Sequence, residues 1–138
     1  MATQRKYNRR VIFGLMLAAM TPAAGAEILN CRPEIKYECR LQACERITED
    51  FKHAEYFILD TAGKTLMACL WTACFVGQAT VFQQESGLTA IGSLLRDGSD
   101  TEKRLISISM DDDRRFTAIW NHGSESTTLD MGICRTGP

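Results

Sequence analysis

The chain has 138 residues, and 45% of them are hydrophobic. A single domain of this length can bury a core without help, and no low-complexity linker divides the sequence. Residues 1–26 hold four of the 16 Lys and Arg and none of the 17 Asp and Glu, so residues 27–138 carry 12 basic and 17 acidic residues, a formal net charge of −5. This acidic excess disfavours nucleic acid as a partner, because such binding depends on neutralising phosphates. It favours a basic protein partner, or simply keeps the protein in solution.

The N-terminal segment has the pattern of a secretory signal peptide. Four basic residues precede an apolar run at 11–20, Pro22 ends the run, and Ala24-Gly25-Ala26 supplies small residues at the spacing of a cleavage site. A membrane anchor is the alternative, but the run reaches only about half of the ~20 residues that a spanning helix needs. We therefore expect cleavage after Ala26 and export to the periplasm or beyond. The mature chain, residues 27–138, is then a single β domain without stable membrane insertion.

The six cysteines predict a disulfide framework, because their number is even and the chain is exported. Six cysteines allow fifteen pairings, but two of the pairs flank four-residue loops, where cross-strand neighbours in a hairpin come within reach of a disulfide. A zinc site is the alternative, since the spacing just falls within the range of ligand pairs. Oxidation on export disfavours it, and His53 and His122 lie in no ligand-like pattern, so we expect no metal and no cofactor. The predicted pairs are Cys39–Cys44, Cys69–Cys74 and, by default, Cys31–Cys134.

The rest of the chain alternates like β-strands. Residues 105–110 show the clearest period of two, with Ile106, Ile108 and Met110 on one face and the two serines on the other. Turn signals recur about every ten residues, which predicts an all-β antiparallel barrel or sandwich of about eight strands. One or two helical turns at most fit residues 42–54. The expected strands are residues 35–39, 54–59, 66–70, 74–82, 88–95, 105–110, 115–120 and 127–134.

The loop between Cys69 and Cys74 contains two large apolar residues, Leu70 and Trp71. A loop tip is normally polar, because its backbone faces water. The pair could fold over an open end of the barrel as a plug for the core, or it could stand out as an anchor for a partner. Trp is enriched at binding hot spots, and a disulfide lowers the cost of ordering a loop on binding. Leu70 and Trp71 are therefore the candidate partner-binding residues, with both alternatives open.

The sequence contains no catalytic constellation that we recognise. It has no Gly-x-Ser-x-Gly elbow and no phosphate loop, and the acids at 111–113 are adjacent instead of alternating as in a calcium loop. We therefore expect a non-enzymatic protein with no catalytic residues. An enzyme of unknown type would require His53 or His122 to lie in a pocket beside an acid and a nucleophile.

The export signal, the Cys-x4-Cys hairpin and a closing strand that ends Gly132-Ile133-Cys134 resemble a group of small, uncharacterised secreted proteins of alphaproteobacteria. The resemblance implies an export route and a small β fold, and no activity. The chain is also similar to periplasmic inhibitors of c-type lysozyme, which are exported eight-stranded β proteins with a basic target. Ser86-Gly87 is a poor match to their Ser-Gly-rich inhibitory segment. The leading expectation is an exported non-enzymatic binding or interaction protein, with lysozyme inhibition as the alternative and an enzyme of unknown type as the third.

Overall fold

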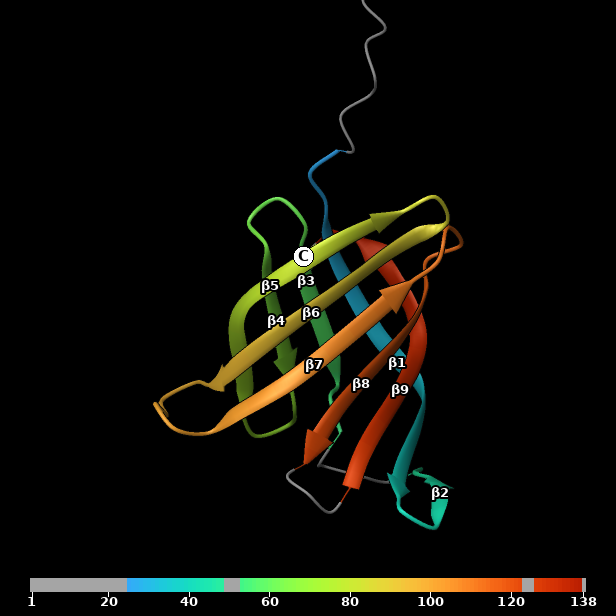
Figure 1. Ribbon diagram of the computed structural model, residues 1–138, viewed down its shortest axis with the longest axis vertical. Helices are drawn as coiled ribbons and strands as arrows, with labels where there is room; N and C mark the ends of the chain where they lie inside the picture. The colour runs from blue at the N-terminus through green and yellow to red at the C-terminus, as the bar shows by residue number, and fades with distance from the viewer. Residues whose placement is uncertain (1–24, 49–52, 123–125, 138) are drawn as a thin grey trace, which may run out of the picture.

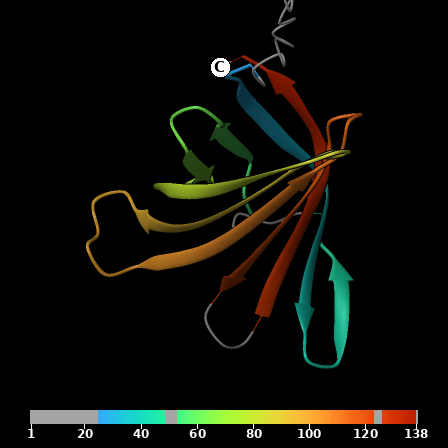
Figure 2. The same cartoon turned by 45° about the horizontal axis from the view of Figure 1, so that its top comes forward.

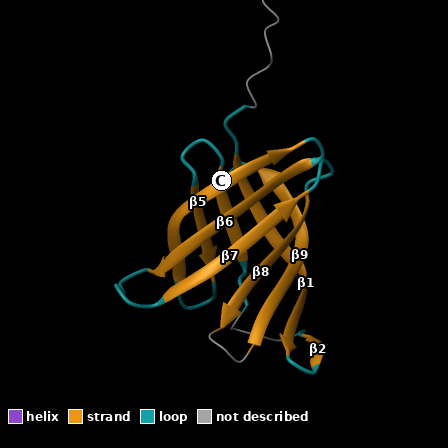
Figure 3. Ribbon diagram, viewed as in Figure 1, coloured by secondary structure: helices purple, strands orange, loops and turns teal. Residues whose placement is uncertain are grey.

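A closed antiparallel β-barrel makes up the described part of the chain, as seen in a computed structural model that describes residues 25–48, 53–122 and 126–137 (Figure 1). Eight strands follow one another around the barrel, and β1 closes it by pairing with β9; β2 extends the sheet beyond β1. Only strands and loops occur in these residues (Figure 3). The prediction of an all-β fold of about eight strands is confirmed, and the choice between barrel and sandwich falls to the barrel. The strands are β1 (Ile28–Arg40), β2 (Ala43–Arg46), β3 (Tyr56–Asp60), β4 (Thr65–Cys69), β5 (Cys74–Gln84), β6 (Gly87–Arg96), β7 (Lys103–Met110), β8 (Arg115–His122) and β9 (Ser126–Thr136).

Strand β1 is longer than the sequence pattern predicted, because it serves two neighbours in turn. Its first residues pair with β3 and its last ones with β2, while β9 runs along the whole of its other side. The register with β9 shifts between Pro33 and Ile35, and Gly132 lies at this bulge. A Cβ at Gly132 would collide with the carbonyl of Arg32, so the bulge requires glycine there. The helical turns allowed for residues 42–54 are wrong for Ala43–Arg46, which pairs with β1 as a strand.

Alternate residues of each strand fill the barrel interior. Ile106 and Ile108 are fully buried and Met110 packs against the core, as the period of two predicted. Aromatic rings cross the interior edge to face: Phe57 lies 5.9 Å from Phe116 and 6.3 Å from Trp120 between ring centroids. The apolar residues Leu129, Met131 and Ile133 of β9 share the outer face of the barrel. The inward residues of β9 are Thr128, Asp130 and Cys134, all buried.

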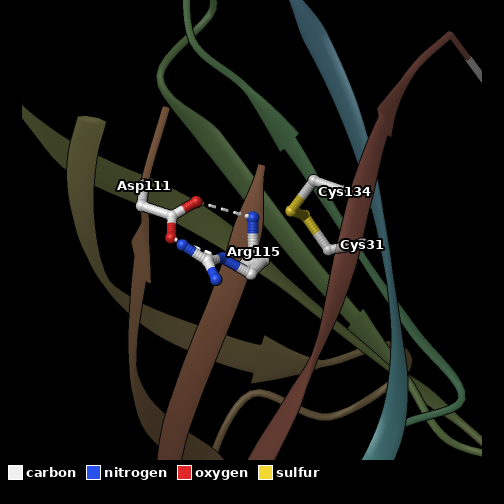
Figure 4. The surroundings of a disulfide bond; sticks show 4 residues. All are labelled: Cys31, Asp111, Arg115 and Cys134. Atoms are coloured by element: carbon white, nitrogen blue, oxygen red, sulfur yellow. Dashed lines mark hydrogen bonds and ion pairs between the residues drawn. A yellow bond between two sulfur atoms is a disulfide. The ribbon is translucent and has the colours of Figure 1, made fainter. Parts of the chain in front are cut away.

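Three disulfides join residues that lie directly opposite each other in the sheet, and all three predicted pairings are confirmed. Cys39–Cys44 and Cys69–Cys74 each span 5 residues of sequence, whereas Cys31–Cys134 spans 103 and ties β1 to β9 (Figure 4). No cysteine of the chain is left as a free thiol. Such crosslinking fits a protein of an oxidising compartment. The described residues include no helix long and apolar enough to cross a membrane.

Candidate interaction surface

The loop that joins β4 to β5 is closed at its base by two interactions. Cys69 and Cys74 face each other across the hairpin and are bonded. One residue further, the Leu70 N–H donates a hydrogen bond of 2.8 Å to the Ala73 carbonyl. Trp71 and Thr72 are left at the tip, and both are exposed. The crosslink and the hydrogen bond together restrict the backbone of the tip, so little order remains to be gained when it binds.

The two candidate residues of this loop lie in different environments. Leu70 is partly buried and packs against the hydrophobic core. Trp71 is 68% exposed. Leu70 therefore has the position expected of a plug, whereas Trp71 has the exposure expected of an anchor. Leu70 covers the end of the core, and most of the Trp71 side chain is accessible to solvent.

The first Cys-x4-Cys segment builds a second hairpin of the same kind. Cys39 is paired with Cys44 across the β1–β2 turn, and Leu41 at its tip is 100% exposed. The β1–β2 turn and the β4–β5 turn both lie at the end of the barrel drawn at the bottom of Figure 1. The sequence analysis did not single out Leu41. Its signal was the one that marked Trp71: a large apolar residue inside a four-residue loop between cysteines.

A buried polar cluster lies beneath this end of the barrel. His53 Nδ1 lies 3.0 Å from Asp130 Oδ1, and Trp120 Nε1 donates a bond of 3.2 Å to Asp130 Oδ2. The side chains of His53 and Asp130 are both 0% exposed. The pair joins residues 77 apart in sequence and holds the loop before β3 against β9. The protein thus encloses the His53 side chain; the side chain of His122 lies outside the described part of the structure.

Arg104 places a guanidinium group near the aromatic rings that adjoin this cluster. Its guanidinium carbon lies 5.7 Å from the centroid of the Phe75 ring, and Phe75 in turn meets Trp120 edge to face at 6.2 Å. Arg104 also donates to Glu102 at 3.1 Å. Hydrogen bonds from Arg96 first, and then from Arg104, lower the pKa of Glu102 although desolvation opposes them. A charged group thus borders the aromatic part of the core beside Phe75.

A separate groove of about 700 Å³ lies against the outer surface of β6 to β9 and β1. Apolar side chains and hydroxyls line it together, including Ile35, Met131, Ser109 and Thr117. Thr89 Oγ1 lies 3.1 Å from Ser109 Oγ, so these hydroxyls satisfy each other. Neither Leu70 nor Trp71 contributes to this groove.

Within the part of the chain that the structure describes, no group of three or more His, Cys, Asp or Glu is placed to hold a metal ion. No family model, no curated protein and no solved structure matches the chain.

Proposed function

We propose that this is an exported, non-enzymatic interaction protein that contacts its partner through a tip surface, formed by the loop 70–73. The observation that carries the proposal is Trp71, 68% exposed on a loop that a disulfide and a hydrogen bond close at its base. Burying an aromatic residue of this size against a partner supplies a large apolar contribution, and indole N–H can also donate a hydrogen bond. Rigid exposed Trp residues are the usual anchors of protein interfaces.

Two features favour a role of the tip surface in partner binding over a role in stabilising the fold. Leu70 already covers the core from this loop, so Trp71 is not needed for that purpose. Leu41 adds a second apolar residue at the same end of the barrel, again on a crosslinked turn. We place the protein in the periplasm or outside the cell, with residues 1–26 removed, because the leader pattern and three disulfides agree on an oxidising compartment.

The experiment compares capture of partners by immobilised residues 27–138 from a native envelope extract. Wild-type protein, Trp71→Ser and Ile91→Ser are used side by side; Ile91 is an exposed apolar residue on the barrel wall, 40% exposed, and serves as the matched control. We expect Trp71→Ser to capture at least about tenfold less partner than wild type, because replacing a hot-spot residue costs roughly 2 kcal/mol or more of binding free energy. Ile91→Ser should capture as well as wild type. Equal capture by Trp71→Ser would remove the tip surface from the proposal.

Inhibition of a c-type lysozyme is a second candidate. An eight-stranded barrel with a formal charge of −5 over residues 27–138 would attract a basic enzyme. A lysis assay with purified residues 27–138 tests this directly. Undiminished lysis in micromolar protein would exclude it and leave the interaction proposal untouched.

A further inference from the structure

The last five residues of β5 form a strand edge without a neighbour on one side. β4 pairs with β5 only as far as Gln78, and the Ala79 N–H then donates to the Lys64 carbonyl at 2.8 Å. β6 continues to pair with β5 up to Gln84. Among the strands that the structure describes, none pairs with residues 80–84 on the β4 side. In Figure 1 this half of β5 runs along the upper border of the front sheet, and Figure 2 shows the same stretch from above.

The direction of the backbone groups on this edge follows from the pairing. In an antiparallel sheet, the N–H and C=O of one residue point to the same side, and successive residues alternate. Because Ala79 points toward β4, Val81 and Gln83 point the same way and offer two donors and two acceptors at the edge. A cavity of about 310 Å³ borders the end of this edge at Gln83 and Gln84, and Glu27 and Thr61 also line it.

Nothing on this edge discourages pairing. Residues 79–84 contain no charged residue and no proline, and natural proteins use both to block sheet edges. Another unpaired edge, that of β2, is four residues long and carries Glu45 and Arg46. By the same rules, that short charged edge is protected and the β5 edge is not.

We infer that residues 80–84 of β5 pair antiparallel with the same residues of a second copy of this chain, forming a two-fold dimer. This register sets Val81 opposite Gln83 of the other copy, so all the unused backbone groups of the edge find partners. Phe82, 50% exposed on the outer face, then meets its own counterpart at the two-fold axis. The unpaired stretch is filled from end to end by the same stretch of the partner.

Charges at the ends of the edge favour a second copy as the occupant. Lys64 lies beside Ala79, at one end of the unpaired stretch, and Glu85 follows Gln84 at the other end. The antiparallel register brings Glu85 of one copy next to Lys64 of the other, twice per dimer. Both residues are exposed, so each can reach a partner. The dimer leaves the tip surface accessible, because Trp71 lies beyond the opposite end of β5.

Cysteine crosslinking tests the register. A residue that faces itself across a non-hydrogen-bonded pair has a Cα–Cα distance of about 4.5 Å, which a disulfide can span. Phe82→Cys should therefore form a disulfide dimer in mild oxidant. Thr80→Cys is the matched control, since Thr80 is exposed on the same strand and face but lies opposite Gln84 in the dimer. Phe82→Cys that crosslinks no faster than Thr80→Cys would overturn the inference.

Sedimentation velocity measures the dimer itself. The pairing is short, so we expect a weak dimer that is seen near 1 mM and dissociates near ~10 µM. Lys64→Glu should raise the dissociation constant roughly tenfold. Each exposed ion pair contributes little to the affinity, but the variant dimer loses two of them. Adding Glu85→Lys to that variant should restore it to within about twofold. Wild-type protein that stays monomeric near ~1 mM, or a double variant no better than the single one, would exclude this dimer, and neither result bears on partner capture by Trp71.

Discussion

The long disulfide should stabilise this protein far more than either short one. Replacing Cys31 and Cys134 with Ala removes a crosslink between residues 103 apart, whereas the two hairpin crosslinks join residues 5 apart. A crosslink restricts the unfolded chain by an entropy that grows with the logarithm of the loop length. The expected cost is about 4.7 kcal/mol for the long loop and about 2 kcal/mol for each short loop.

The assay is thermal and urea unfolding of three double variants in which one pair at a time is changed to Ala. Cys69–Cys74 is the better control for packing, because Cys69 is 1% exposed, as are Cys31 and Cys134. The difference of roughly 2.7 kcal/mol corresponds to a melting temperature about 10 °C lower for the long-loop variant. If the Cys69–Cys74 variant loses as much stability as the Cys31–Cys134 variant, the argument from loop length is wrong.

Three further predictions concern single side chains. Changing Asp130 to Ala removes the acceptor of two buried hydrogen bonds and should cost about 3 kcal/mol in urea unfolding, while Asn should cost less because it retains an acceptor. Leu70→Ser should lower the free energy of unfolding by about 1–2 kcal/mol, and Trp71→Ser by less than about 0.5 kcal/mol; the reverse order would make Trp71 the plug. Desolvation raises the pKa of Asp111, but hydrogen bonds from the Arg115 backbone and side chain outweigh it, so its pKa lies below the usual range (Figure 4). The stability that this pair contributes is therefore present above the pKa of the unfolded carboxyl and is lost as the pH falls through the lower folded pKa. An NMR titration of Asp111 in wild type and in Arg115→Gln checks this, with an unchanged pKa in the variant as the contrary result.

The confirmed predictions concern features that depend only on residues close together in the sequence. Two cysteines around a four-residue hairpin loop face each other whatever the rest of the fold does, so Cys39–Cys44 and Cys69–Cys74 followed from spacing alone. The alternation of Ile106 and Ile108 with serines likewise needs only the period of a strand. Cys31–Cys134, in contrast, was paired only because no other cysteines remained. Its geometry depends on β1 closing against β9.

The candidate site depended on contacts between distant segments. The sequence marked Leu70 and Trp71 but could not tell which one faces the core, since that depends on how the loop packs against the assembled core. It did not identify Asp130, the acidic residue of β9, because its partner His53 lies 77 residues away.

The sequence by itself predicted eight of the nine described strands and the two hairpin crosslinks, because each depends on neighbours along the chain. Only the tertiary structure placed Leu41 and Trp71 at one end of the barrel and left residues 80–84 of β5 without a neighbour. These features depend on how strands of unequal length meet when the barrel closes: β5 has 11 residues and β4 has 5. The length mismatch becomes an unpaired edge only after the sheet has formed.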